Sequence, residues 1–331
     1  NILVNIKGDN SLSKRPMARI LNPINLMGAK IISSNDNKLP ITIKGPKDVL
    51  AINYHSKISS AQIKSSILLA GLAASGITTV TEPKKSRNHT EKMLLSFGAK
   101  IYSKTLKDGS NRVELAGNPI LKGRNINVPC DPSSAAFLIV AGIICPGSKI
   151  ELQNIMINKS RDGLFTTLKE MGAKIDVFNK RELDGETIAT IHTEYSKLKG
   201  ILVPSNRAPS MIDEYPILSV AAACAKGNTT MEGISELRVK ESDRIKIISD
   251  GLNKSGIKTL EKSSSLTVYG GNIDGGCTID SELDHRIAMS FLILGLVSKK
   301  PIKVLRPSTI ETSFPNFYKI MTEIGAKFTK N

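Results

Sequence analysis

Two apolar patterns alternate along the chain. In the first, a run long enough for a helix is apolar on almost every side, and we expect such helices to be buried because they have no polar face. In the second, an amphipathic run ends at a glycine and is followed by β-type residues, which is typical of a helix that is capped by glycine and turns into a strand. The first pattern lies at the start of four segments: 67–80, 137–150, 217–230 and 291–297. The glycines that end the second pattern are Gly28, Gly98, Gly172, Gly256 and Gly325.

The two patterns form one unit that repeats. Successive glycines are 70, 74, 84 and 69 residues apart, and the sequence Met-Gly-Ala-Lys-Ile occurs at both 27–31 and 171–175. A regular period of this kind indicates a repeat architecture. Each unit is predicted to contain a buried helix, a strand, an amphipathic helix and two more strands, with hairpin turns at 108–109 and 270–271. The fold class is therefore α/β.

The repeat count predicts an incomplete first unit. The sequence has five ends of amphipathic helices but only four buried helices, and it begins at Asn1 without an initiator Met. We expect that the N-terminal part of the first unit lies outside this sequence. An atypical capping repeat is the alternative, because terminal repeats often deviate.

Composition and charge narrow the classes of function. A chain of 331 residues suggests two domains, and the longest apolar run, 135–145, is about half of what a membrane span needs. The four cysteines have no CxxC spacing for zinc, which favours free thiols in a reducing cytoplasm. The net charge of +16 could favour nucleic acid or a phosphorylated metabolite, or could reflect a genome biased toward Lys, Asn and Ile. Aromatic residues are only 4% and Trp is absent, which argues against stacking on single-stranded nucleic acid.

Polar residues open each of the four buried helices. Backbone N–H groups and the positive end of the helix dipole can hold an anion at such places. The repeated scaffold therefore predicts a site for a negatively charged small ligand. The four polar starts are 60–62, 131–134, 213–216 and 284–286.

The stretch 237–244 is the densest in charge. If a helix begins near Glu241, Lys240 and Arg244 lie four residues apart on one face and could clamp a phosphate or a carboxylate. Glu241, held between cations, would be a poised proton carrier. The alternative is an exposed helix start whose charges neutralise one another.

Charged residues also precede the last two buried helices. Asp213 can cap its helix, but capping leaves the adjacent Glu214 unexplained, and we favour a functional role because burying an unpaired charge is costly. Arg286, directly before an apolar run, must pair with a ligand anion or with a neighbouring acid. The four histidines, His285 among them, have no metal-ligand spacing, and there is no P-loop or helix-opening GxGxxG, so neither a metal nor a nucleotide site is predicted.

With these motifs the chain resembles the 5-enolpyruvylshikimate-3-phosphate synthases, or 3-phosphoshikimate 1-carboxyvinyltransferases, and among them the class II bacterial type. The resemblance runs in order from Asn1 to about Lys327. It implies a two-domain inside-out α/β barrel, the enolpyruvyl transferase fold, in which three βαβαββ units surround buried helices in each domain and the domains close on the ligand. About four and a half of six units are present, with a partial first domain at 1–127 and the second domain at 128–331. The motifs that carry the resemblance are GDNSLSKRPM from Gly8, SAQIKS from Ser60, EPKKSRNHTE from Glu82, MIDEYPIL from Met211, ELRVKESDR from Glu236, LDHRIAMS from Leu283 and TSFP from Thr312.

The resemblance also implies an activity, in the shikimate pathway of chorismate and aromatic amino acid biosynthesis. The family transfers the enolpyruvyl group of phosphoenolpyruvate to the 5-hydroxyl of shikimate 3-phosphate and releases phosphate, without a metal or organic cofactor. By position, Asp213 takes the hydroxyl proton and Glu241 shuttles a proton at the methylene carbon of phosphoenolpyruvate. A monomer with no nucleic-acid or membrane partner is expected. The residues implied to hold phosphoenolpyruvate are Arg15, Arg244 and Arg286. The residues implied to line the shikimate 3-phosphate pocket are Ser60, Ala61, Gln62, Ser86, Arg87, Asp213, Glu236 and Lys240.

Some positions depart from the family pattern. Cys130 stands where a Gly usually precedes the Asp of the interdomain crossing, so that turn is expected to be strained or rebuilt. Ala61 replaces a frequent Ser, which leaves only its backbone to contact the ligand. Glu311 and Thr312 stand where class I enzymes carry a Lys near phosphoenolpyruvate. Family residues that hold both substrates lie upstream of Asn1, so we expect this chain alone to be inactive.

Three other functions remain open at the level of sequence. UDP-N-acetylglucosamine enolpyruvyl transferase shares the fold and the donor, but it lacks a run like 240–244 and uses a cysteine on a mobile loop. The basic charge and the repeat units also allow an RNA-end-processing or nucleic-acid-binding protein, whose affinity for oligonucleotides would depend steeply on salt. A non-catalytic remnant is the third possibility.

Overall fold

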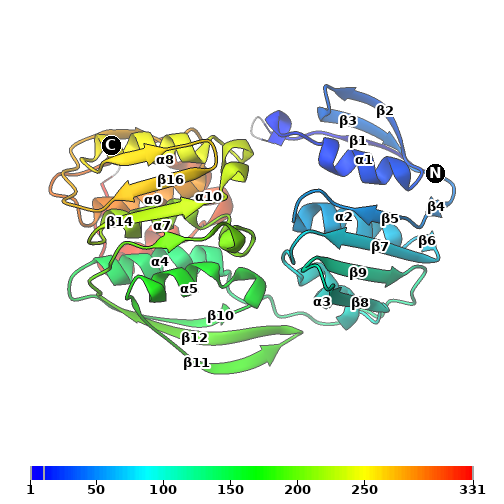
Figure 1. The fold of residues 1–331 in the computed structure, drawn as a ribbon, viewed down its shortest axis with the longest axis horizontal. Helices are drawn as coiled ribbons and strands as arrows, with labels where there is room; N and C mark the ends of the chain where they lie inside the picture. The colour runs from blue at the N-terminus through cyan, green and yellow to red at the C-terminus, as the bar shows by residue number, and fades with distance from the viewer. Residues whose placement is uncertain (1, 10–11, 330–331) are drawn as a thin grey trace. The chain divides into compact units, whose positions relative to one another are not determined.

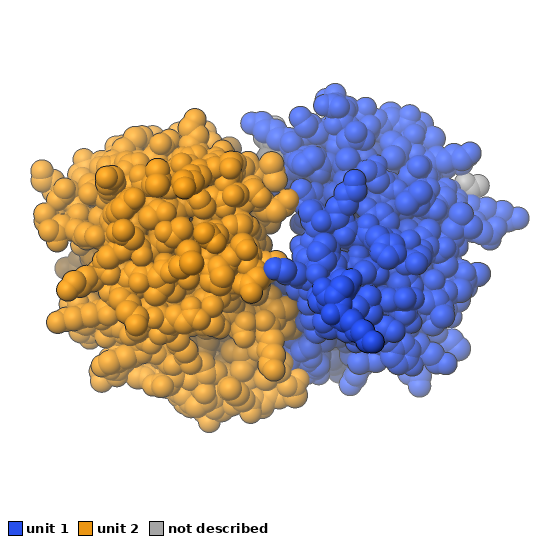
Figure 2. All heavy atoms as spheres, in the orientation of Figure 1, with its two compact units in different colours: residues 1–128, 183–186 blue, residues 129–182, 187–331 orange. Residues whose placement is uncertain are grey.

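The computed structural model describes residues 2–9 and 12–329. The chain divides into two compact units (Figure 2): unit 1 is Asn1–Val128 with Leu183–Glu186, and unit 2 is Pro129–Glu182 with Thr187–Asn331. Compactness does not show that each part folds independently, so the division into domains at 127 and 128 stays a prediction. In the described part of the chain, no helix is both long and apolar enough to cross a membrane.

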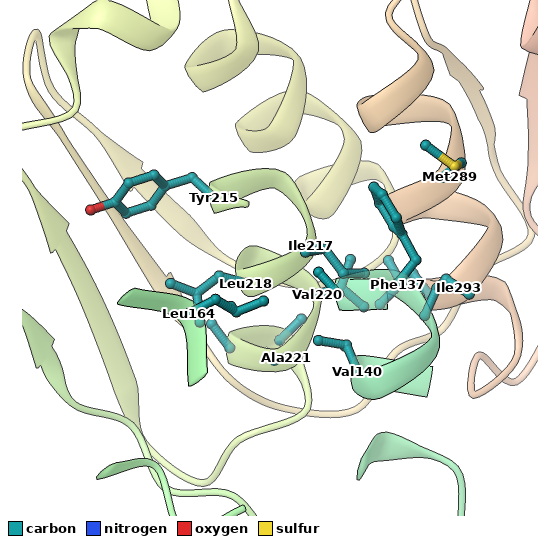
Figure 3. Packing of buried hydrophobic residues seen from close by; sticks show 14 of the residues in the cluster. Phe137, Val140, Leu164, Tyr215, Ile217, Leu218, Val220, Ala221, Met289 and Ile293 are labelled. Atoms are coloured by element: carbon teal, nitrogen blue, oxygen red, sulfur yellow. The ribbon is translucent and has the colours of Figure 1, made fainter. Parts of the chain in front are cut away.

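Three helices form the centre of unit 2. They are α4 (Pro132–Ile144), α7 (Tyr215–Ala223) and α9 (His285–Gly295), and each packs against the other two (Figure 1). All of α7 and all of α4 except Ser134 are buried, which confirms the prediction from their apolar pattern. Removing this apolar surface from water is the main favourable contribution to folding of the unit. Figure 3 shows side chains that pack in this core: Phe137, Val140, Leu164, Tyr215, Ile217, Leu218, Val220, Ala221, Met289 and Ile293.

Strands of three sheets pack on this helical core. β10 contacts α4, β16 contacts α7 and β18 contacts α9. The sheet orders are β10-β12-β11, β13-β14-β16-β15 and β17-β18. In the first sheet, β10 and β12 are antiparallel, with a bulge between Leu152 and Ile155. The strands of unit 2 are β10 (Lys149–Met156), β11 (Lys174–Leu183), β12 (Glu186–Glu194), β13 (Leu202–Val203), β14 (Asn228–Glu232), β15 (Thr259–Glu261), β16 (Ser265–Tyr269), β17 (Thr278–Asp280) and β18 (Lys303–Leu305).

Amphipathic helices follow the buried ones, as the repeat predicts. In unit 2 they are α5 (Gly163–Glu170), α8 (Arg244–Lys254) and α11 (Phe317–Glu323). The predicted glycine C-caps are confirmed, because each of the five glycines has a positive φ of between 90° and 104° just after its helix. The short helical turns of unit 2 are η2 (Lys159–Arg161), η3 (Ser205–Arg207), α6 (Ala208–Met211), η4 (Ser235–Val239), η5 (Pro307–Thr309) and α10 (Ile310–Ser313).

Unit 1 contains one helix of the apolar type, α2 (Ala61–Gly71), which packs on α1 and on β7 and β9. Ile67 and Leu68 are fully buried there, but Leu69 is 54% exposed. The expectation of burial on every side is therefore wrong for α2, because the described elements that pack on it leave Leu69 uncovered. Its sheets are β1-β3-β2, β4-β6 and β5-β7-β9-β8. The remaining elements are β1 (Leu3–Ile6), η1 (Leu12–Lys14), α1 (Ala18–Leu26), β2 (Lys30–Asn35), β3 (Lys38–Lys44), β4 (Val49–Leu50), β5 (Asn53–His55), β6 (Ala74–Ser75), β7 (Ile77–Glu82), α3 (His89–Ser96), β8 (Ile101–Thr105) and β9 (Asn111–Ala116).

One of the two predicted hairpin turns is correct. Residues 108–109 lie in the turn between β8 and β9, and Gly109 has a φ of 83°. The prediction for 270–271 is wrong, because β16 ends at Tyr269 and the next strand belongs to another sheet. Gly270 instead permits a close backbone approach, since a Cβ atom there would lie 1.9 Å from the carbonyl oxygen of Ala225.

Cys130 does not strain the chain. It pairs in a parallel bridge with Ile155, where its N–H donates to the carbonyl oxygen of Asn154 and its own carbonyl accepts from Met156, both at 3.0 Å. It is not among the described residues with a positive φ. The expectation of a strained turn is therefore wrong, since a residue with a Cβ fits this backbone.

Candidate active site

Arg244 opens α8 and is completely buried. The helix begins there because Asp243, in the N-cap position, accepts a hydrogen bond of 3.1 Å from the backbone N–H of Lys246. A buried guanidinium has lost its hydration, so it must be paired with carboxylates. The partners of Arg244 therefore identify the most highly charged site inside unit 2.

Three carboxylates surround Arg244. Its Nε lies 2.8 Å from Oδ2 of Asp284, and its Nη2 lies 2.6 Å from Oε2 of Glu241. Its Nη1 lies 3.5 Å from Oδ1 of Asp213. These acids are far apart in the sequence, so only the fold brings them to one guanidinium.

Two further cations complete the group. Lys240 Nζ lies 3.6 Å from Oδ1 of Asp213, and Nη1 of Arg286 donates to the backbone oxygen of Asp213 at 3.3 Å. A phosphate or carboxylate that binds here would compete with Asp213 and Glu241 for the cations of this group. We call the following six residues the Arg244 cluster: Asp213, Lys240, Glu241, Arg244, Asp284 and Arg286.

Asp284 connects the cluster to the start of α9. Its Oδ1 caps that helix and accepts from the backbone N–H groups of Arg286, at 2.9 Å, and Ile287, at 3.4 Å. Its Oδ2 accepts from Arg244 and from the hydroxyl of Ser242, the latter at 3.1 Å. Both oxygens of this fully buried carboxylate are thus satisfied.

The surroundings shift three pKa values. Burial pushes the pKa of Asp284 up, but the attraction of Arg244 outweighs it and holds that pKa below its usual value. Burial also works against the charge of Arg244, but Asp284 and Glu241 raise its pKa. Arg244 and Asp284 are therefore ionised together at neutral pH. Burial lowers the pKa of His285, so its ring is neutral at that pH.

The N-terminal ends of the three central helices meet at this end of unit 2. Arg286, in the first turn of α9, reaches Asp213 just before α7, and the hydroxyl of Ser133, in the first turn of α4, donates to Glu214. The three helices therefore run in the same direction. Their positive dipole ends favour an anion on the side of the Arg244 cluster.

Two predictions about the charged stretches are wrong. α8 begins at Arg244 and not near Glu241, so Lys240 and Arg244 do not share a helix face; they approach the same carboxylate, Asp213. Asp213 does not cap α7 either. Glu214 occupies the N-cap position without a side-chain cap bond, and Asp213 faces the cations.

Glu214 has partners of its own. Its Oε1 accepts from Ser133 and lies 3.8 Å from Nη2 of Arg161, which also contacts Asp131 at 3.2 Å. The two adjacent acids therefore face different partners. Glu214 ties the start of α7 to the start of α4, which explains the second acid without a catalytic role.

In unit 1, the start of α2 and the loop after β7 bring together a second set of predicted residues. Ser60 caps α2 by accepting from the backbone N–H of Ile63 at 3.5 Å, and Ala61 and Gln62 form its first turn. The loop is joined to this start because the backbone N–H of Lys84 donates to the hydroxyl of Ser59 at 2.9 Å.

Buried charges fix the same loop. Lys64 Nζ lies 3.0 Å from Oε1 of Glu82 and 2.7 Å from Oε1 of Glu91. Glu82 Oε1 also accepts from the backbone N–H of Ser86 at 2.9 Å. The Ser86 hydroxyl is buried and has no hydrogen-bond partner in the described part of the chain, a costly state that a bound ligand would relieve.

The structure places the other predicted residues in both units. Arg15 follows η1 and Arg87 follows Ser86, both half-buried in unit 1, while Glu236 is half-buried in η4 of unit 2. None of the three belongs to the Arg244 cluster as defined above.

Sequence reasoning missed several residues that hold these sites together. Asp284 and Ser242 bind or support Arg244, and Lys64 and Glu82 fix the Ser86 loop. Lys64 gave the one signal in the sequence. A lysine in a mostly apolar helix indicates a buried acid nearby, because a buried charge needs a partner.

Comparison with known proteins decides the family. The profile of the family EPSP synthase (3-phosphoshikimate 1-carboxyvinyltransferase) matches residues 1–321. The 3-phosphoshikimate 1-carboxyvinyltransferase of Chelativorans sp. (strain BNC1) is 52% identical over 324 residues, which are 97% of this chain and 72% of the relative. The chain belongs to the EPSP synthase family.

Further EPSP synthases agree with this assignment. The 3-phosphoshikimate 1-carboxyvinyltransferase of Brucella abortus (strain S19) is 48% identical over 98% of this chain and 73% of its own length. The solved EPSP synthase of Acinetobacter baumannii superposes with a TM-score of 0.84 at 43% identity, over 98% of this chain and 74% of that one. The enolpyruvyl transferase NikO of Streptomyces tendae, at 15% identity and a TM-score of 0.77, shows the shared fold. Membership in the EPSP synthase family supports that activity over the alternatives left open by the sequence.

Proposed function

We propose that the Arg244 cluster is the catalytic part of this chain. As a member of the EPSP synthase family, the protein transfers the enolpyruvyl group of phosphoenolpyruvate to the 5-hydroxyl of shikimate 3-phosphate and releases phosphate. Both substrates are anions that need cations, and the transfer needs groups that move protons. The cluster offers both kinds of group, with cations and acids 2.6 to 3.6 Å apart.

The arrangement around Arg244 carries this proposal. Its Nε is committed to the buried Asp284, which fixes the plane of the guanidinium. Its two Nη groups then face Asp213 and Glu241, the two acids to which the resemblance to the family assigns proton transfer. A cation that is fixed in advance needs little reorganisation when charge develops in the reaction.

The proposed phosphoenolpyruvate ligands are Arg244, Arg286 and Arg15. Arginine suits this role because its planar fork can bind a carboxylate or a phosphate through two parallel hydrogen bonds. In the described part of the chain, the guanidinium of Arg286 makes one hydrogen bond, to the backbone oxygen of Asp213, so its charge is available to a ligand.

The proposed shikimate 3-phosphate ligands combine hydroxyl, amide and charged groups. Ser86 supplies a buried hydroxyl without a partner, and Lys240 supplies an ammonium next to Asp213. The start of α2 supplies backbone N–H groups to a phosphate. The full proposed set is Ser60, Ala61, Gln62, Ser86, Arg87, Asp213, Glu236 and Lys240.

The two acids have different proposed tasks. Asp213 takes the proton of the 5-hydroxyl as the hydroxyl oxygen bonds to phosphoenolpyruvate, and Lys240 and Arg244 lie 3.6 and 3.5 Å from that carboxylate. Glu241, which pairs with Arg244 at 2.6 Å, shuttles a proton at the methylene carbon.

Binding measurements on Arg286 test this assignment. In the complete gene product, Arg286→Ala should weaken the binding of phosphoenolpyruvate more than that of shikimate 3-phosphate, because Arg286 is assigned to phosphoenolpyruvate only. Isothermal titration measures both affinities. Arg161→Ala is a matched control, since it also removes a partly buried arginine of unit 2 but one that contacts Glu214 and Asp131. A larger loss for shikimate 3-phosphate in Arg286→Ala would contradict the assignment.

We further propose that the protein acts as a monomer in the cytoplasm and has no nucleic-acid partner. The low aromatic content and the absence of Trp support the last point. Fluorescence anisotropy with single-stranded oligonucleotides at low and high salt tests it. Tight binding that weakens steeply with salt would contradict it.

A further inference from the structure

Arg238, in η4, makes hydrogen bonds in two directions within unit 2. On one side, Nη1 donates to both carboxylate oxygens of Asp243, at 3.1 and 2.9 Å. On the other side, Nε donates to the carbonyl oxygen of Ser263 at 3.0 Å and Nη2 to that of Lys262 at 2.7 Å. Nη2 also lies 2.9 Å from Oε1 of Glu261. Every nitrogen of the guanidinium is therefore engaged.

These bonds anchor the two ends of one short segment. The carbonyls of Lys262 and Ser263 belong to the turn between β15 and β16, so η4 is fixed to a hairpin. Asp243 is the N-cap of α8, so the other side of Arg238 is fixed to a helix. Between these anchors, residues 240–242 have no helix or strand of their own.

Each residue of 240–242 reaches the interior of unit 2. Lys240 approaches Asp213 at 3.6 Å, and Glu241 pairs with Arg244 at 2.6 Å. The hydroxyl of Ser242 donates to Asp284 at 3.1 Å. The position of this segment therefore sets three contacts of the Arg244 cluster at once.

Arg238 differs from an ordinary surface ion pair, which would contribute little. Its side chain is 26% exposed, and its nitrogens bind on two sides, Nη1 to the Asp243 carboxylate and Nε and Nη2 to the β15–β16 turn, which fixes orientation as well as distance. Burial works against its charge, but hydrogen bonds with Glu261 and Asp243 raise its pKa. Lysine could not replace this geometry, because its ammonium has no planar fork.

We propose that Arg238 is a positioning residue, which ties Asp243 to the β15–β16 turn and so holds Lys240 and Glu241 in place against Asp213 and Arg244. The proposal rests on the functions proposed above for Lys240 and Glu241. Precise placement matters because a small displacement of a proton carrier can cost a large part of the rate.

Kinetics of Arg238 variants in the complete gene product test the proposal. Arg238→Ala should lower kcat at least about tenfold. Added guanidinium ion should restore part of the lost kcat, because it can occupy the space that the arginine side chain leaves. Arg238→Lys should stay impaired although it keeps the charge, since it lacks the fork. Unchanged kcat in Arg238→Ala would overturn the proposal, and so would full activity of Arg238→Lys.

A double-mutant cycle separates positioning from a general loss of structure. If Arg238 acts through Lys240 and Glu241, the loss of activity in Arg238→Ala with Glu241→Gln should be smaller than the product of the two single losses. Losses that multiply would show that Arg238 acts elsewhere, and would overturn the proposal. Normal turnover of Glu241→Gln alone would instead refute the proposed role of Glu241, so the two failures are distinguishable.

Glu170→Ala provides the matched control. Glu170 also forms a pair of hydrogen bonds with an arginine of unit 2, Arg207, at 2.6 and 2.7 Å. Removing it should change the melting temperature as much as Arg238→Ala or less, while kcat stays within about twofold. A fall in kcat equal to that of Arg238→Ala would overturn the proposal, because losing any bidentate pair would then suffice.

Discussion

Arg244 and Asp284 form a fully buried ion pair, with 2.8 Å between Nε and Oδ2, and the same Asp284 caps α9. One carboxylate therefore serves both the charge balance of the cluster and the start of a core helix. Stability and the proposed catalysis are thus coupled at this residue.

Asp284→Ala should destabilise the protein by about 3–5 kcal/mol, because it leaves a buried guanidinium without its fully buried partner and removes a helix cap. Asp284→Asn should cost less, since an amide oxygen can still cap α9. Urea unfolding of both variants measures the difference. Equal losses would mean that the ion pair, and not the cap, accounts for the effect.

Asp213→Ala and Glu241→Ala should each lower kcat by about 10²–10⁴-fold while substrate binding largely survives, because each removes a proposed proton carrier. Steady-state rates and titrations in the complete gene product give the two quantities. Glu232→Ala, at an exposed acid of unit 2, should leave both unchanged. Near-normal turnover of either variant would remove that acid from the mechanism.

Glu186 should make unit 1 sensitive to acid. Burial raises its pKa, but hydrogen bonds from His89, at 2.6 Å, and Lys92, at 2.9 Å, outweigh that effect and lower the pKa to about 2. The unfolded chain binds this proton near the ordinary pKa of 4.5, so the stabilisation is complete above about pH 4.5 and is lost as the pH falls toward 2.

Glu186→Gln should therefore make the free energy of unfolding less dependent on pH between about 4.5 and 2. Urea titrations at several pH values measure the slope. Glu151→Gln, at an exposed acid, serves as the control. An unchanged slope in Glu186→Gln would contradict the assigned pKa.

The positive charge of the chain is concentrated in unit 1, and it should speed the capture of anionic substrates. Unit 1 has 20 Lys and Arg against nine Asp and Glu, a net charge of +11, while unit 2 has 26 against 21, a net charge of +5. Long-range attraction of this kind raises association rates and is screened by salt.

Replacing the exposed Lys57 and Lys84 of unit 1 by Glu should lower kcat/KM for shikimate 3-phosphate several-fold at low salt, on the order of 3–10-fold, with kcat unchanged. In about 0.5 M salt the difference should vanish. The same change at the exposed Lys197 and Lys226 of unit 2 is the control and should have a smaller effect. Equal losses from both pairs would show that the location of the charge does not matter.

The sequence by itself determined the repeat, the type of most elements and the chemical nature of the site. Periodicity suffices for this because a run that is apolar on all sides, such as that of α7, is stable only when it is buried in the core. A glycine such as Gly172 can end a helix because it adopts a φ of 94° at little cost in free energy. Motif order sufficed to suggest the family, and Asp213, Glu241, Arg244 and Arg286 were all named from it.

Only the tertiary structure decided which charges meet. The partnership of Glu214 with Ser133 and the pairing of Arg244 with Asp284 join residues that are 81 and 40 positions apart in sequence. Local propensity carries no information about such contacts. They follow from the need to pair every buried charge once the helices have packed, and that need is settled in three dimensions.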